Sequence, residues 1–215
     1  MKIGRHAREQ LAELIAGATP LRGAFFRSVA FKYFHPDDVV SGEGTRLHGG
    51  RFVPVGVRAV YASADEETAM REVTARKNAL SGRKQIPIGE YPRMTYVLSV
   101  TTRRNLNLAG KLPRELAGLV MKCLRSSEYS LSQELAAIWI PEGIDSAVFP
   151  SATGAGNNVA IYLGNAARRS VAVRNRDQVL EALRRPQVSK RRRETKEARR
   201  AALTELAAYD QELGI

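Results

Sequence analysis

The chain has 215 residues, of which 44% are hydrophobic and 26% are charged. This length can bury one substantial core but not two large ones, and the composition is that of an ordinary globular protein. No apolar run approaches the roughly 20 residues of a membrane span, and the N-terminus lacks the apolar stretch of a secretory signal. A single cysteine, Cys123, excludes an internal disulfide framework and a cysteine-based zinc site. We therefore expect a cytoplasmic protein without a bound metal.

The predicted elements begin with a helix, because apolar residues recur at helical spacing over 6–17. A strand is predicted over 24–31. The polar segment 35–50 is rich in Gly and Asp, and we interpret it as a long loop whose length favours a functional role. A second strand is predicted over 57–63.

The next helix is predicted to begin directly after this strand. Ser63 and Glu66 have the S-x-x-E spacing of a capping box, and the helix would turn Ala69, Met70 and Val73 inward. Further strands are predicted over 94–102, 145–152 and 158–164, and further helices near 113–126 and 131–139. Strands and helices in this mixed order predict an α+β fold rather than a doubly wound parallel sheet.

The C-terminal segment differs from the body in charge. The net charge is +12, and more than half of it lies between positions 174 and 200, where eleven Lys or Arg residues face four acidic ones. We divide the chain into an N-terminal helix (1–20), a main domain (21–185), and a basic linker with a C-terminal helix (186–215). Basic runs favour anionic partners, so one hypothesis is a nucleic-acid-binding module.

Three places in the sequence carry residues suited to chemistry. Gly49 and Gly50 allow close backbone approach to a ligand, and Arg51 beside them offers a guanidinium fork suited to phosphate. Taken alone, this segment is more typical of a Gly-Gly turn before a strand, followed by a solvated arginine. Glu72 borders the apolar face of its predicted helix, where it could stabilise a cation or simply pair with Arg76 one turn later.

Ser151 is the third candidate, because it follows Pro150 at the end of a predicted strand. A turn-forming role is the alternative. A serine-hydrolase nucleophile is disfavoured, since no G-x-S-x-G surrounds it and the three histidines of the chain have no matching motif. Cys123 lies in an apolar helical pattern, which predicts a buried core residue rather than a catalytic thiol.

These residues occur together in a recognisable order. Arg27 in "FFRSV", Arg51 in "GGRF", Tyr61 in "AVY", Glu72 in "TAMREV" and Ser151 in "VFPSA" resemble the RES-domain family over roughly residues 24–173. That family is named for its Arg, Glu and Ser and supplies the toxins of bacterial RES–Xre toxin–antitoxin pairs. Many relatives have Asn after "GGRF", where this chain has Val53, so the polar contact of that Asn is not expected here.

The resemblance implies a fold related to ADP-ribosyltransferases: a mixed β core with flanking helices, here with a C-terminal helical extension. It implies NAD as the substrate, and an Xre-family antitoxin as the partner, through which DNA is contacted indirectly. Inorganic phosphate as a co-substrate and a homodimer within the complex are compatible with it. The implied function is that of a type II toxin that cleaves the nicotinamide–ribose bond by phosphorolysis or hydrolysis, or alternatively transfers ADP-ribose to a protein.

The resemblance also assigns roles to the residues. Arg27, Arg51 and the backbone of 49–50 would bind the diphosphate, and Tyr61 would pack against the nicotinamide or its ribose. Glu72 would stabilise positive charge at the anomeric carbon, and Ser151 would orient the Glu72 carboxylate or a ribose hydroxyl. Arg51, Glu72 and Ser151 are therefore the expected catalytic set. The acceptor stays open, because water, phosphate and a protein side chain would all react with the same ribosyl cation.

Overall fold

The computed structural model describes residues 3–30, 33, 35–81, 93–154, 156–175 and 177, with the backbone alone over 76–81. No helix in these ranges is long and apolar enough to cross a membrane. The predicted linker and helix at 186–215 lie outside the described residues. The helices are α1 (Arg5–Ala16), α2 (Pro36–Val40), α3 (Glu43–His48), α4 (Glu66–Ser81), α5 (Arg114–Arg125) and α6 (Ser130–Trp139). The strands are β1 (Thr19–Ala30), β2 (Ala59–Ser63), β3 (Arg93–Asn107), β4 (Ser146–Pro150), β5 (Asn157–Tyr162) and β6 (Val171–Val173).

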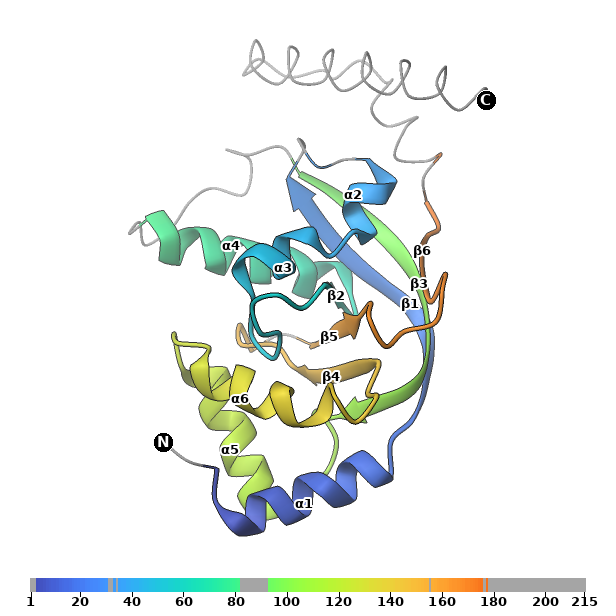
Figure 1. The fold of residues 1–215 in the computed structure, drawn as a ribbon. Helices are drawn as coiled ribbons and strands as arrows, with labels where there is room; N and C mark the ends of the chain where they lie inside the picture. The colour runs from blue at the N-terminus through green and yellow to red at the C-terminus, as the bar shows by residue number, and fades with distance from the viewer. Residues whose placement is uncertain are drawn as a thin grey trace.

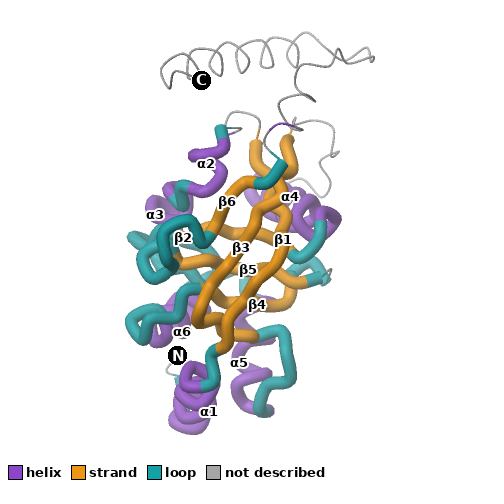
Figure 2. The backbone as a smooth tube through the Cα atoms, turned by 90° about the vertical axis from the view of Figure 1, so that its right-hand side faces the viewer, coloured by secondary structure: helices purple, strands orange, loops and turns teal. Residues whose placement is uncertain are grey.

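The strands form one sheet that closes on itself (Figures 1 and 2). Its order is β1-β2-β5-β4-β3-β6, and an additional pairing of β1 with β3 joins the two sides into a ring. The long strand β3 makes this possible. It pairs antiparallel with β1 over most of its length and parallel with β4 through Asn105–Asn107. The predicted α+β class is therefore confirmed, with a barrel-like mixed sheet at its centre.

Alternating side chains of β2 and β5 feed two hydrophobic clusters. One cluster takes Ala59 and Tyr162 from these strands and joins them to β4 and to α1, α5 and α6. The other takes Val60 and Ile161 and joins them to β1, β3 and α2. Because successive side chains of a strand point to opposite faces, β2 and β5 are buried on both sides. These two strands are consequently among the best-fixed parts of the molecule, and the candidate site is built at their ends.

The segment 35–50 is not the long loop that the sequence predicts, because it contains the short helices α2 and α3. Pro36 occupies the start of α2, and Asp37 and Asp38 lie in its first turn, which suits a helix N-terminus. Gly42, with a φ of 67°, separates the two helices. The many Gly and Asp residues make these two short helices hard to predict, since the same residues are typical of loops.

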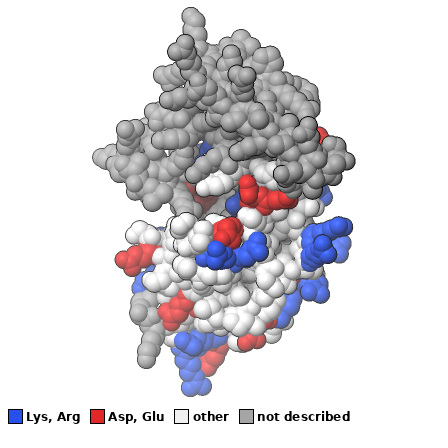
Figure 3. Space-filling model, turned by 45° about the horizontal axis from the view of Figure 1, so that its top comes forward, with Lys and Arg blue, Asp and Glu red and all other residues white. Residues whose placement is uncertain are grey.

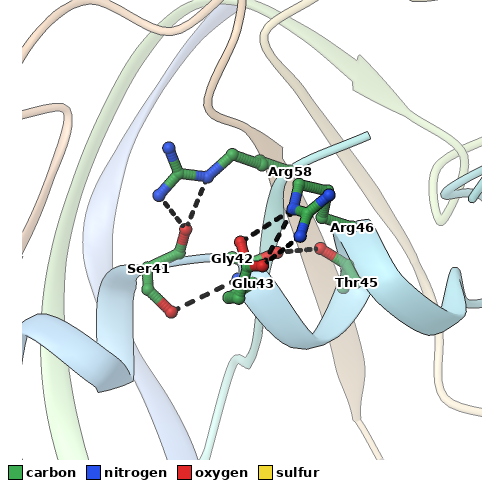
Figure 4. A network of polar contacts seen from close by, with 6 residues as sticks. All are labelled: Ser41, Gly42, Glu43, Thr45, Arg46 and Arg58. Carbon is green, nitrogen blue, oxygen red and sulfur yellow. Dashed lines mark hydrogen bonds and ion pairs between the residues drawn. The ribbon is translucent and has the colours of Figure 1, made fainter. Parts of the chain in front are cut away.

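Polar contacts tie the corner between α2 and α3 to the start of β2 (Figure 4). Arg58 donates to the carbonyl of Ser41 at 2.8 and 3.0 Å, and Arg46 pairs with Glu43. The hydroxyl of Thr45 lies 2.7 Å from the carbonyl oxygen of Gly42 and accepts from the backbone of β2 at 2.8 Å. The chain entering the 49–53 segment is thereby held at a fixed position on the sheet.

Helix α4 begins differently from the prediction. Asp65, not Ser63, caps it, because Asp65 Oδ1 accepts from Thr68 N at 2.7 Å and Oδ2 accepts from Thr68 Oγ1 at 2.7 Å. Ser63 is the last residue of β2, and its hydroxyl instead donates to Asn158 Oδ1 on β5. The predicted capping box is therefore wrong, since sheet pairing directs the Ser63 side chain toward the neighbouring strand.

Candidate functional site

Glu72 lies where helix α4 meets the ends of β4 and β5. Its Oε1 accepts hydrogen bonds from Ser151 Oγ at 2.6 Å, Asn158 Nδ2 at 2.7 Å and Ala152 N at 3.1 Å. Among the described residues no donor reaches the other carboxylate oxygen, Oε2. One oxygen is thus fixed by its neighbours while the second is left to interact with another group. The expected alternative pairing with Arg76 involves a side chain outside the described ones.

The direction of each hydrogen bond around Ser151 follows from donor counting. A hydroxyl has one proton, and a carboxylate can only accept, so Ser151 donates to Glu72. The Oγ of Ser151 then accepts from Thr153 N at 3.1 Å and from the Thr153 hydroxyl at 2.7 Å. Thr153 in turn borders a surface hollow beside α4. The serine therefore donates its one proton to the carboxylate and orients it, and among the described residues no histidine or lysine hydrogen-bonds to the serine hydroxyl.

The turn that carries Ser151 is pressed against the start of α4. Ser151 N donates to the carbonyl of Gly156 at 3.0 Å, which closes the turn. A Cβ at Gly156 would lie 2.5 Å from both Asp65 Oδ2 and Thr68 Oγ1, so only glycine fits. The cap of α4 and the turn bearing Ser151 therefore share one contact, and this contact holds Ser151 opposite Glu72 on the helix.

Sequence reasoning missed Asn158 and Ser63. Both are buried, with exposed fractions of 8% and 4%, and they face each other across the β2–β5 ladder. Asn158 is the first residue of one predicted strand, and Ser63 is the last residue of another, where the sequence also predicts a helix cap. Only the strand register, which local sequence does not specify, shows that they meet. The signal that was available is the polar pair at the ends of two otherwise apolar strands.

Arg27 on β1 lies beside the same region. Its Nη1 donates to the carbonyl of Tyr61 at 2.6 Å, while its buried Nε has no partner among the described residues. Burial, reinforced by the positive charge of Arg93, lowers the pKa of Arg27 to about 10, so the side chain stays charged at neutral pH. No carboxylate within the described ranges pairs with Arg27 or with Arg93. Two neighbouring cations without an acidic partner among the described residues favour an anion here.

Arg51 is held elsewhere, at the end of helix α5. Its Nη1 donates to the carbonyls of Cys123 and, at 3.1 Å, of Ser126, and its guanidinium carbon lies 5.0 Å from the centroid of the Tyr129 ring. Nε and Nη2 make no hydrogen bond within the described part of the chain. The structure thus brings Glu72 and Ser151 together but gives Arg51 no contact with either. Cys123 is buried in α5 as predicted, and burial raises the pKa of its thiol to about 11.

The glycines beside Arg51 are explained by packing. Gly49 has a φ of 62°, and a Cβ at Gly50 would lie 2.7 Å from the hydroxyl oxygen of Tyr61. That hydroxyl donates to the carbonyl of Arg51, and the Tyr61 ring packs edge-on against Phe149. Gln133, which sequence reasoning also missed, donates from α6 to the carbonyls of Gly50 and Val53 at 3.2 and 3.3 Å. The Val53 side chain is fully buried in the core.

Comparisons with known proteins place the chain in a family. One solved structure that it resembles is described as the crystal structure of the M. tuberculosis MbcT-MbcA toxin-antitoxin complex. The match has 20% identity and a TM-score of 0.64, and it covers 81% of this chain and 97% of that one, which shows a shared fold. No curated protein sequence matches. The RES domain profile matches residues 24–184, which are most of the chain, so the protein belongs to the RES domain family.

Proposed function

We propose that this protein is the toxin of a type II toxin–antitoxin system and that it cleaves NAD at the nicotinamide–ribose bond. Membership of the RES domain family supports this assignment, as does a fold shared with a protein solved in a toxin–antitoxin complex. One observation carries the chemical part of the proposal. Three donors hold Glu72 Oε1, and no donor in the described ranges reaches Oε2.

The reaction requires such a carboxylate. Breaking the bond between ribose and a cationic nicotinamide passes through an oxocarbenium-like transition state, as in other glycoside cleavage. A negative charge held beside the anomeric carbon stabilises that state more than it stabilises the ground state, and this difference accelerates the reaction. Glu72 would present Oε2 to the ribose, either to the developing positive charge or to a ribose hydroxyl, while Ser151 and Asn158 keep the carboxylate from rotating.

The arginines would bind the diphosphate. Arg27 and Arg93 form a cationic pair without a described acidic partner, and burial lowers the pKa of both. An anion would relieve the cost of keeping two charges together away from water. Arg51 has Nε and Nη2 to offer while Nη1 keeps the end of α5 in place. Tyr61 contacts Arg51 through its hydroxyl and Arg27 through its carbonyl. Its ring would pack against the nicotinamide ribose.

The identity of the group that accepts the ADP-ribose distinguishes three reactions. Water would give a glycohydrolase, inorganic phosphate would give an NAD phosphorylase, and a protein side chain would give an ADP-ribosyltransferase. We favour a small acceptor, phosphate or water. An ADP-ribosyltransferase-like fold with NAD bound in a cleft is part of the same proposal, and it suits all three reactions because each begins with cleavage of the same bond.

An Xre-family antitoxin is the proposed partner, with DNA contacted through it and with a homodimer compatible with such a complex. The alternative of a simple nucleic-acid-binding module gains little from the face of the molecule drawn in Figure 3. On the face in Figure 3, basic and acidic groups lie close to one another between uncharged residues. Phosphate backbones are bound by extended surfaces of one sign, and mixed charges of this kind do not supply one.

Incubation of the purified chain with adenine-labelled NAD tests the proposal directly. Nicotinamide should be released, and the labelled product should be ADP-ribose without phosphate or ADP-ribose 1″-phosphate with it. Label that becomes attached to protein would favour the transferase. NAD left intact by wild-type protein, or lost equally with Glu72→Ala, would overturn the assignment. In bacteria, expression should arrest growth and a co-expressed antitoxin should restore it, whereas normal growth with abundant folded protein would count against a toxin.

A further inference from the structure

The donors around Glu72 come from two parts of the chain that differ in rigidity. Ser151 and Ala152 belong to the turn after β4, where Ser151 N donates to the carbonyl of Gly156 and Gly154 N donates to the carbonyl of Ser151. Asn158 belongs to β5, where it pairs with Ser63 of β2 on one side and with Phe149 of β4 on the other. A side chain on a central strand is held more accurately than one on a turn.

Hydrogen bonding leaves the Asn158 amide one orientation. The carboxylate of Glu72 can only accept, so it must face the Nδ2 donor, and Oδ1 then points to Ser63. The Ser63 hydroxyl donates to this Oδ1 at 2.7 Å. Both side chains are buried, so each polar atom depends on its partner for a hydrogen bond. The direction of both hydrogen bonds is therefore fixed: Ser63 donates to Asn158, and Asn158 donates to the Glu72 carboxylate.

We propose that Asn158, held by Ser63, is the positioning residue that fixes the carboxylate of Glu72, and that the turn residues Ser151 and Ala152 complete the arrangement. The proposal rests on the proposed function, in which Glu72 acts on NAD. Asn158 would not touch the substrate. Its contribution would come from keeping Glu72 Oε2 aligned with the ribose, which affects the chemical step rather than binding.

The test compares Asn158→Ala with a matched pair elsewhere in the sheet. Asn105 and Ser146 form the same kind of buried contact, with Ser146 Oγ donating to Asn105 Oδ1 at 3.0 Å. Removal of either asparagine should lower stability to a similar degree. Loss of about 1 Å in alignment costs on the order of 100-fold in rate. We therefore expect kcat for NAD cleavage to fall about 100-fold in Asn158→Ala, with KM changed less than about threefold, as for a loss confined to the transition state.

Asn158→Asp sharpens the comparison, because it keeps the size of the side chain and the acceptor for Ser63. It replaces the donor facing Glu72 by an oxygen that repels it, so kcat should fall at least as far as in Asn158→Ala. Ser63→Ala leaves the amide orientation dictated by Glu72 and should lower kcat by about tenfold, the low end of the range seen when outer residues that support a metal site are removed. Asn105→Ala should change kcat less than about twofold, as expected for a site without shared partners.

A crystal structure of Asn158→Ala gives a readout that does not depend on catalysis. The Glu72 carboxylate should rotate away from Ser151 or occupy two conformations, while the α4 backbone stays in place. An unchanged carboxylate in this variant, or kcat lowered equally by Asn158→Ala and Asn105→Ala, would overturn the proposal. If wild-type protein does not cleave NAD, the proposed function fails, and the position of Glu72 in the variant still decides whether Asn158 fixes it.

Discussion

The carboxylate of Glu72 and the guanidinium of Arg51 are each held through one atom, but their partners differ, because two side chains and a backbone N–H hold Glu72 whereas backbone carbonyls hold Arg51. Glu72 receives donors on one oxygen and keeps the other available in the described structure. Arg51 donates from Nη1 to carbonyls at the end of α5 and lies over the Tyr129 ring. Its Nη1 is therefore already used in hydrogen bonds within the protein. Tyr61 links the Arg51 segment to the sheet. Its ring packs against Phe149, and its hydroxyl donates a hydrogen bond to the carbonyl of Arg51.

This difference separates preorganisation for a ligand from stabilisation of the fold. A side chain prepared for a substrate is rigid and incompletely satisfied, whereas one that stabilises the fold is satisfied before any ligand arrives. By this criterion Glu72 fits the catalytic role proposed for it. Arg51 has a structural role through Nη1 in addition to its proposed role in binding through Nε and Nη2. Substitutions in the two regions should therefore separate activity from stability.

Glu72→Gln should give the largest effect. It keeps the shape of the side chain and an acceptor at Oε1 but removes the negative charge, so NAD cleavage should fall by about 100- to 1,000-fold, as for loss of an electrostatic stabiliser. The free energy of unfolding should change little. Nicotinamide release measured beside urea denaturation tests both points. Glu67→Gln is the control, since Glu67 is an exposed residue of the same helix that pairs with Arg71, and equal rates in the two variants would contradict the role of Glu72.

Arg51→Met should lower stability even in the absence of NAD. The carbonyls of Cys123 and Ser126 would lose their shared donor, which costs about 1–3 kcal/mol when partly buried groups are left unpaired. Arg71→Met should cost less than about 1 kcal/mol, because its partner Glu67 is exposed. Denaturation of both variants without ligand provides the measurement. An Arg51 variant of unchanged stability with a raised KM would show that the residue serves binding alone.

Gly50→Ala should destabilise the protein by about 1–2 kcal/mol, as overpacking does, because its Cβ would lie 2.7 Å from the Tyr61 hydroxyl. Gly118→Ala is the matched control. Gly118 is an exposed residue within α5 with nothing near its Cβ, so alanine should stabilise this helix by up to about 1 kcal/mol. Opposite signs in thermal unfolding are expected. A neutral Gly50→Ala would mean that the segment adjusts and that packing does not require this glycine.

Cys123→Ala should have the smallest effect on catalysis, since Arg51 contacts the backbone of this residue and not its thiol. NAD cleavage per folded molecule should equal that of wild type. Burial raises the pKa of the thiol from 9.0 to about 11, so the native state holds this proton more tightly than the unfolded chain. This contribution to stability is complete below pH 9 and is lost as the pH rises toward 11. Rapid alkylation of the folded protein at pH 8 would contradict the burial.

The sequence predicts the elements better than their contacts. Periodicity identifies α1, α5, α6 and the strands of the ring, because burial on one or two faces leaves a local pattern. The prediction of a long loop over 35–50 is wrong because the Gly and Asp residues there form both turns and helix ends. The prediction of a capping box at Ser63 is wrong because the register of β2 with β5 directs the Ser63 hydroxyl toward the neighbouring strand. Glu72 and Ser151 come from the combined motif. The partners of Asn158 and Gln133 lie far away in sequence, so the polar residue at the end of an apolar strand marks Asn158 without showing what it contacts.

The long sequence separations around Glu72 also determine when the site can exist during synthesis. Its donors Ser151 and Asn158 follow it by 79 and 86 residues. A growing chain therefore exposes helix α4 well before β5 has left the ribosome, and until then the carboxylate lacks the groups that hold it. Premature termination before Asn158 would yield a polypeptide that cannot assemble the site. For a protein proposed to harm the cell that makes it, only a translation product that extends past Asn158 would be dangerous.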